Sequence, residues 1–122
     1  MRTKYAKYPE YHTSLDNFDV VTDKGLEGSY NLYTKIIEVL ENNFYYKVKV
    51  LGEPQLGKRG LYPTSCTPDT DYDLAFLYRN FLAYADGKND LIDIANIIGV
   101  SAYRLVEVAK LFLEHKLVEK KL

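Results

Sequence analysis

The stretch DLIDIANIIGVSAYRLVEVAKLFL, residues 90–113, contains two helical apolar patterns separated by one glycine. The residues on the two apolar faces are Leu91, Ile94, Ala95 and Ile98 in the first pattern, and Leu105, Val108, Ala109, Phe112 and Leu113 in the second. Asp90 and Ser101 precede the two patterns, at positions where a side-chain oxygen caps the free N–H groups of a helix. Gly99 lies between them, where a residue free to adopt positive φ favours a turn. The sequence therefore predicts two short helices joined by a tight turn.

The segments on either side of this pair predict a further helix and a strand. A third helix is expected after Pro68, capped by Asp69 or Asp71 and ending at residues 86–88. Its apolar face is formed by Leu74, Leu77, Tyr78, Phe81 and Leu82. Residues 117–122 are expected to form a terminal strand. Three helices, a glycine turn between the last two and a closing strand match a helix-turn-helix with a rudimentary wing.

The first half of the chain predicts a different arrangement. Residues 1–22 lack helical periodicity and favour a loop with short extended pieces. A long helix follows, capped by Thr22 or Asp23 and ended by residues 42–43. Its stripe consists of Leu26, Tyr30, Tyr33, Ile37 and Leu40. Residues 44–50 alternate between apolar and polar side chains, which indicates a strand with one dry face.

A linker is expected over residues 55–68, which contain two glycines and two prolines. This segment divides the chain into a predicted domain of residues 1–64 and a second of residues 65–122. The expected fold class is α+β and mostly α. It comprises an N-terminal arm, a long helix and a short strand, followed by a three-helix winged helix-turn-helix domain.

Composition favours a soluble globular protein. The chain has 122 residues, 47% of them apolar or aromatic, and a formal net charge of −1. No apolar stretch approaches the roughly 20 residues that a membrane helix needs, and no signal peptide is evident. The single cysteine, Cys66, excludes an internal disulfide and agrees with a cytoplasmic setting. We therefore expect no membrane partner.

Charge argues against nucleic acid as a partner of the winged domain. From Pro68 onward there are seven Lys or Arg residues and nine Asp or Glu residues, a net charge of −2. The candidate recognition helix contains Arg104 and Lys110, balanced by Glu107 and Glu114. DNA binding depends largely on neutralising phosphates with cations. The sequence thus favours packing within a protein or against a protein partner over binding to DNA.

His12, in the segment PEYHTSLDN of residues 9–17, is the one candidate metal ligand of the first half. A neutral imidazole binds zinc well, and a nearby carboxylate can orient the ring. Catalytic zinc usually needs about three protein ligands, however, and no suitably spaced cluster accompanies His12. From the residues alone, the interpretation of His12 as an ordinary loop histidine ranks above its interpretation as a metal ligand. His115, the other histidine, is explained by its place in the last turn of a predicted helix.

A family resemblance changes this weighting. Residues 11–17, YHTSLDN, followed by a long helix, resemble the last metal-binding segment of the co-catalytic zinc aminopeptidase and glutamate carboxypeptidase family. More closely, nearly the whole chain resembles the C-terminal portion of aminopeptidase-like proteins that end in a winged helix-turn-helix domain. The stretches that carry this likeness are RTKY with YPEYHTSLDN, then GEPQLGKRGLYP, then NFLAYADG, at residues 2–5, 8–17, 52–63 and 80–87.

The resemblance implies roles for three residues of this segment. His12 falls at the family's terminal zinc ligand, and Tyr11 falls where some relatives place a hydroxyl that stabilises an oxyanion. The alternative for Tyr11 is an aromatic side chain that packs on the sheet. Asp16 takes the acidic position of the motif, where orientation of the loop or imidazole and a simple Asx-type turn are equally compatible readings.

The remaining catalytic groups of such enzymes belong on polypeptide upstream of this chain. The resemblance therefore implies a C-terminal piece of a zinc-dependent hydrolase with peptide-like substrates, which has no catalytic activity alone and binds zinc weakly at most. Its expected partner is the upstream peptidase domain or a second copy of the chain. The alternative hypothesis is a winged-helix protein that binds DNA or dimerises.

Overall fold

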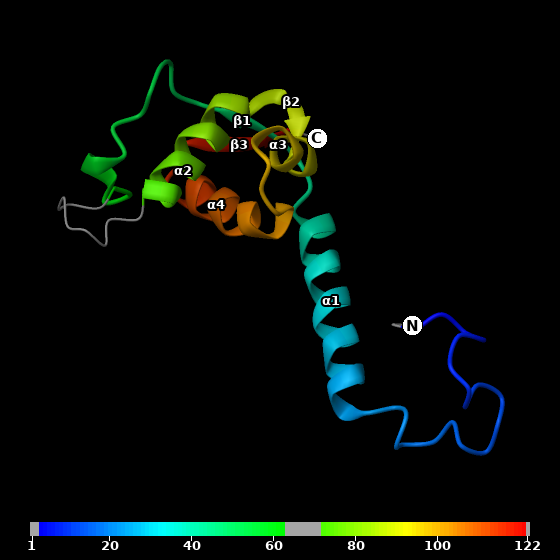
Figure 1. The fold of residues 1–122 in the computed structure, drawn as a ribbon. Coiled ribbons are helices and arrows are strands. Elements are labelled where there is room, and N and C mark those ends of the chain that lie inside the picture. The colour runs from blue at the N-terminus through cyan, green and yellow to red at the C-terminus, as the bar shows by residue number, and fades with distance from the viewer. Residues whose placement is uncertain (1–2, 63–71, 122) are drawn as a thin grey trace. The chain divides into compact units, whose positions relative to one another are not determined.

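The computed structural model describes residues 3–62 and 72–121, which fold as two compact units, Met1–Ile37 and Glu38–Leu122 (Figure 1). The elements in chain order are α1 (Asp23–Glu41), β1 (Tyr45–Val48), the 3-10 helix η1 (Gly57–Arg59), α2 (Tyr72–Tyr84), β2 (Asp86–Asp90), α3 (Leu91–Ile98), α4 (Ala102–Glu114) and β3 (Val118–Lys121). The fold is α+β and mostly helical, as the sequence predicts. Within the described residues, no helix combines the length and the apolar character that crossing a membrane requires.

The second unit contains a three-stranded antiparallel sheet with β1 in the middle (Figure 1). β1 pairs with β3 in regular register, from Tyr45 opposite Lys121 to Val48 opposite Val118. Its pairing with β2 contains an irregularity. The expected strands at residues 44–50 and 117–122 are therefore confirmed in shortened form. The domain boundary predicted between residues 64 and 65 falls inside this unit, because β1 is hydrogen-bonded to both later strands.

β2 was missed by the sequence analysis, which treated residues 86–88 only as the end of a helix. Its sequence, DGKND, has no alternating apolar residues, so it forms a strand only because β1 offers it a pairing edge. Asp86 Oδ1 accepts hydrogen bonds from the N–H groups of Lys88 at 2.8 Å and Asn89 at 3.2 Å. Gly87 has φ +83°, and a Cβ there would lie 3.2 Å from Lys121 Cδ. The turn into β2 thus depends on local polar geometry.

The core of the second unit is formed by one sheet face and three helices. Its largest fully buried side chains include Tyr46, Phe81 and Phe112, each with 0% exposure. The ring centroids of Tyr46 and Phe81 are 5.6 Å apart, and those of Phe81 and Phe112 are 5.7 Å apart, both edge-on. Burial raises the pKa of Tyr46 to about 12, and its hydroxyl donates to the carbonyl of Asn42 at 2.9 Å. This aromatic chain connects the sheet to α2 and α4.

The α3–α4 turn forms as the sequence predicts. Asp90 and Asp93 make a reciprocal capping box at the start of α3, in which the Asp93 N–H donates to Asp90 Oδ1 at 2.8 Å. Gly99 adopts φ 72° and ends α3. Ser101 occupies the N-cap position of α4, but its side chain makes no capping hydrogen bond, which corrects the role expected for it. Its ψ of 130° still redirects the chain into α4.

Helix α1 begins where the sequence predicts but buries no side chain. Thr22 caps it, since its Oγ1 accepts from the N–H of Gly25 at 3.2 Å. None of its 19 residues is buried. Seven large apolar residues of α1 are each 45–70% exposed to solvent: Leu26, Tyr30, Leu32, Tyr33, Ile36, Ile37 and Leu40. Among residues 3–62 and 72–121 this apolar stripe stays exposed, which is unusual for a helix of this length because packing supplies most helix stability in proteins.

The end of α1 is fastened within the second unit by Asn43. Its amide nitrogen donates to Asp90 Oδ2 at 3.1 Å, and its amide oxygen accepts from the N–H of Ile92 at 3.0 Å. Both groups belong to the start of α3, 47 to 49 residues later in the chain. Asn43, two residues after the end of α1, therefore positions the start of α3.

The expected linker of residues 55–68 is described in part. Residues 57–59 form η1, and Gly60 follows it with φ 70°. Leu56, just before η1, is 1% exposed and belongs to the core of the second unit. The expected helix caps Asp69 and Asp71 lie outside the described residues, as does Cys66.

Candidate functional site

The candidate site segment around His12 is a series of tight turns. The N–H and hydroxyl of Thr13 both donate to the carbonyl of Glu10, at 3.0 Å and 2.7 Å. The Asp16 N–H then donates to the carbonyl of Thr13 at 3.2 Å. His12, inside the first turn, has φ 60°, a left-handed conformation that residues other than glycine adopt at a cost. These turns hold the His12 side chain exposed to solvent.

Tyr11 packs against other aromatic rings. Its ring centroid lies 4.2 Å from the His12 ring and 5.7 Å from the Tyr8 ring, the latter edge-on. A third ring, that of Tyr5, lies 6.0 Å away. This cluster packs the Tyr11 ring against neighbouring rings of the same segment and brings it beside the imidazole of His12. The contact places the two residues of the motif together.

Asp16 binds a tyrosine that the sequence analysis did not single out as a site residue. Tyr8 donates its hydroxyl hydrogen bond to Asp16 Oδ2 at 3.0 Å. Desolvation and this hydrogen bond raise the pKa of Tyr8 above its ordinary value of 10. The Asx-type turn considered for Asp16 forms instead at Asn17, whose Oδ1 accepts from the N–H of Asp19 at 2.8 Å. Asp16 thus orients a tyrosine ring, and sequence spacing alone gave no signal of this pairing.

A cavity of about 320 Å³ lies beside the Tyr8 and Asp16 pair in the first unit. Its lining comprises Thr3, Tyr8, Asp16, Val20, Val21, Thr22, Gly25, Leu26 and Ser29. His12 and Tyr11 are absent from this lining. The cavity therefore lies next to the motif but does not contain the candidate ligand.

The described residues do not form a complete zinc site. No three His, Cys, Asp or Glu side chains come together in residues 3–62 and 72–121 in a way that could hold a metal ion. A catalytic zinc ion needs about three protein ligands. His12 therefore fits at most one position of a metal site, and we derive no catalytic step from this chain.

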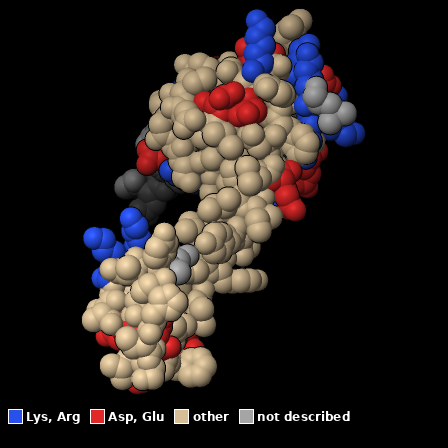
Figure 2. Space-filling view, turned by 90° about the vertical axis from the view of Figure 1, so that its right-hand side faces the viewer, with Lys and Arg blue, Asp and Glu red and all other residues tan. Residues whose placement is uncertain are grey.

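The candidate recognition helix α4 presents few free cations. Lys110 Nζ lies 2.7 Å from Glu38 Oε1, an ion pair that raises the pKa of Lys110 chiefly through this hydrogen bond. Arg104 is exposed, with Glu107 one turn away. Basic side chains instead gather at the sheet end of the unit, with acidic side chains among them (Figure 2). The sheet lysines are Lys47, Lys88, Lys120 and Lys121.

Two families match the chain. Residues 43–120 match a family described as winged helix-turn-helix, and residues 1–43 match a family described as "Domain of unknown function (DUF4910)". The two matches meet at Asn43, which follows the end of α1 and positions the start of α3.

Two relatives from Clostridium acetobutylicum extend these matches. One, provisionally named a polysaccharide biosynthesis protein with an aminopeptidase-like domain, is 39% identical over 107 residues, which cover 86% of this chain and 24% of the relative. The other is a crystal structure provisionally described as a peptidase, with a TM-score of 0.72 and 34% identity over 93% of this chain and 24% of that one. The chain therefore spans about a quarter of the length of either relative.

Proposed function

Because this chain belongs to the winged helix-turn-helix family, whose match covers residues 43–120, we propose that its winged unit is a packing module of an aminopeptidase-like hydrolase. Residues 1–43 would then belong to the peptidase-like part of that hydrolase. The winged unit would dock against that part, and the 122 residues alone would have no catalytic activity. The relatives named as aminopeptidase-like or as a peptidase support this assignment, and the matched region covers 24% of each.

The observation that carries the proposal is the apolar stripe of α1, which stays exposed within the part of the chain that the structure describes. Tyr30, Tyr33 and Ile37 are 70%, 54% and 55% exposed, although their spacing is that of a core-facing helix. Burying one large apolar side chain contributes about 1.5–3 kcal/mol, so covering this stripe would stabilise an interface by several times that amount. A longer polypeptide would supply the missing cover.

In that protein we propose that His12 supplies one zinc ligand and that Tyr11 lies beside it. When bound, the metal would supply Lewis-acid activation of water for hydrolysis of a peptide-like substrate. What this chain contributes is the placement of the imidazole: the turn at residues 10–13 exposes it, and the Tyr11 ring packs against it at 4.2 Å. The other ligands would come from outside the chain.

The metal proposal is tested by grafting. In a chimera, this chain replaces the matching segment of the Clostridium acetobutylicum relative, and bound zinc is measured by metal analysis together with release of amino acids from amide substrates. We expect His12→Ala to lower both zinc content and activity. His115→Ala is the matched control and should change neither, because His115 is the C-cap of α4 in the winged unit. Unchanged zinc content in the His12→Ala chimera would refute the role of His12.

The isolated chain provides a second test of the same proposal. We expect it to release nothing from amino-acid amides with zinc present, because the described residues form no group of three potential ligands. Turnover by the purified 122-residue chain would overturn the assignment.

The alternative, binding to duplex DNA, is favoured by one observation, the lysines at the sheet end of the winged unit (Figure 2). A salt-dependent affinity for duplex DNA, measured by fluorescence anisotropy, would support it. The ion pair between Lys110 and Glu38 argues against DNA binding by α4 and for the packing role, because one of the two cationic side chains of α4 is already paired with a carboxylate.

A further inference from the structure

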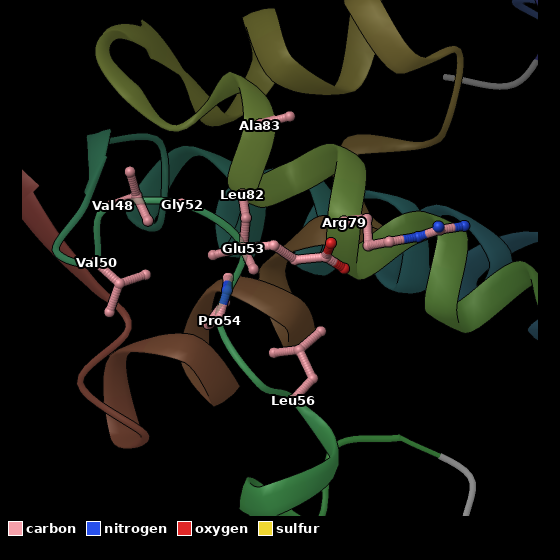
Figure 3. Close-up of a pocket in the computed structure, with 9 residues that line it drawn as sticks. All are labelled: Val48, Val50, Gly52, Glu53, Pro54, Leu56, Arg79, Leu82 and Ala83. Atoms are coloured by element: carbon pink, nitrogen blue, oxygen red, sulfur yellow. The ribbon is translucent and has the colours of Figure 1, made fainter.

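The winged unit contains a cavity of about 340 Å³ between the end of β1, the loop that follows it and one face of α2. The residues that line it are Val48, Val50, Gly52, Glu53, Pro54, Leu56, Arg79, Leu82 and Ala83 (Figure 3). Most of its exposed lining is apolar, and the cavity is partly open to solvent. Its size is at the lower end of the range for small-molecule sites, about 300–1,000 Å³.

Two side chains of opposite charge lie at this apolar cavity. The Glu53 side chain extends from the loop towards the face of α2 that carries Arg79 (Figure 3). Both residues are exposed, and within residues 3–62 and 72–121 neither has an ion pair or a hydrogen bond through its side chain. An apolar wall with one free carboxylate is therefore available to a ligand. The Arg79 guanidinium extends away from the apolar lining in Figure 3, and rotation of this exposed side chain would bring it over a bound ligand.

These groups match a small zwitterion with an aliphatic side chain. A carboxylate attracts an ammonium group, and a guanidinium binds a carboxylate through two parallel hydrogen bonds. The floor formed by Val48, Leu56 and Leu82 suits a branched aliphatic group. We propose that this cavity binds a free amino acid with an aliphatic side chain, such as leucine, with Glu53 on its ammonium group and Arg79 on its carboxylate.

This site goes beyond the packing role proposed above. A free amino acid is the product that aminopeptidase chemistry releases, so the winged unit would sense the product of the hydrolase that it accompanies. Binding itself depends only on the cavity of the second unit. It is measured on the 122-residue chain without zinc, and its outcome is separate from that of the metal experiment.

The test is a titration of the full chain with L-leucine, followed by calorimetry and by methyl NMR shifts. We expect saturable binding with a dissociation constant on the order of 1 mM, because both charges are partly screened by solvent. The methyl resonances of Val48, Leu56 and Leu82 should shift.

Two ligand analogues and two variants assign each charge. Arg79→Gln should weaken leucine binding by about tenfold and leave isoamylamine, which lacks the carboxylate, unaffected. Glu53→Gln should weaken leucine binding similarly and leave 4-methylpentanoate, which lacks the ammonium group, unaffected. Arg59→Gln is the matched control, since Arg59 is exposed and absent from the cavity lining.

Both test residues are exposed, so the variants should unfold at the same urea concentration as the parent chain. The proposal is overturned if leucine shifts none of the three methyl groups at concentrations of about 10 mM, roughly tenfold above the expected constant. It is also overturned if the two analogues bind as tightly as leucine, because the cavity would then recognise only the aliphatic group.

Discussion

Helices α1 and α4 have similar apolar stripes, but they differ in what covers them. α4 buries five of its 13 residues, whereas α1 buries none of its 19. Both patterns repeat at the spacing of a core-facing helix, so periodicity alone does not distinguish them. The difference is that α4 lies against a sheet and two helices of its own unit, while the partner of α1 is absent from the described residues. A stripe in a sequence therefore predicts that a helix is covered, but not by which polypeptide.

Removing a large side chain from the covered helix should have the greatest effect. Phe112→Ala deletes a ring with 0% exposure that contacts Tyr78 and Phe81, and should lower the free energy of unfolding by about 3–5 kcal/mol. Urea denaturation followed by circular dichroism measures the change. Phe76→Ala, at a site 55% exposed on α2, is the control and should cost less than about 0.5 kcal/mol. Equal losses in the two variants would contradict the core described here.

Removing the cap of α3 should have the next largest effect. Asp90→Ala deletes the acceptor of the Asp93 N–H and of the Asn43 amide, at 2.8 Å and 3.1 Å. We expect a loss of about 1–2 kcal/mol in unfolding free energy. Glu107→Ala, on the exposed face of α4, should change stability by less than about 0.5 kcal/mol. If the Asp90→Ala variant had the same free energy of unfolding as the parent, neither hydrogen bond would stabilise the unit.

At pH 7 a smaller effect should come from the hydroxyl of Tyr46, whose contribution to stability also depends on pH. Its folded pKa of about 12 exceeds the ordinary value of 10, so the buried neutral phenol contributes stability that is complete below pH 10 and lost as the pH rises towards 12. Tyr46→Phe should cost about 1 kcal/mol at pH 7, where the hydrogen bond to the Asn42 carbonyl is lost.

The alkaline decline should then be shallower in Tyr46→Phe than in the parent, by an amount on the order of 2 kcal/mol between pH 10 and 12. Urea midpoints at pH 7, 10 and 11.5 give the comparison, with the remaining tyrosines and lysines common to both proteins. If the free energy of unfolding fell equally in the parent and the variant over this pH range, folding would not raise the pKa of Tyr46.

Truncating the uncovered stripe should have the smallest effect on the isolated chain. Tyr33→Ala removes a ring that is 54% exposed and introduces a better helix former, so the free energy of unfolding, measured by urea denaturation, should stay within about 0.5 kcal/mol of the parent value. In the chimera with the longer relative, the same variant should destabilise the protein by at least about 1.5 kcal/mol, because the ring would be buried there. A loss of the larger size in the isolated chain would show that α1 is already covered.

The sequence was sufficient for elements whose signals are local. Thr22, Asp90 and Gly99 determine their turns through capping or positive φ, and each of these assignments is confirmed. β2 was not predictable in this way, because its polar sequence forms a strand only through pairing with β1. The contribution of Leu56 to the core was also missed, since a residue in a predicted linker gives no periodic signal.

The candidate site was predictable only as a motif. His12 and Tyr11 are adjacent in sequence, and their ring contact follows from that adjacency together with the left-handed backbone of His12. The hydrogen bond between Tyr8 and Asp16 depends on how several turns fold between them, which no spacing rule specifies. Glu53 and Arg79 come from a loop and a helix far apart in the chain, so only the structure brings them to one cavity.

Asn43 has a practical consequence for anyone who recombines these two modules. The two family matches share this residue as their border, yet both polar atoms of its side chain are committed to the α3 end of the winged unit. A fusion that begins just after residue 43 would remove the two hydrogen bonds of the Asn43 side chain from the winged unit, whose helix α3 they position. A junction placed before Glu38 would keep Asn43, the Asn42 carbonyl bound by Tyr46 and the Glu38 carboxylate with the fold that they stabilise.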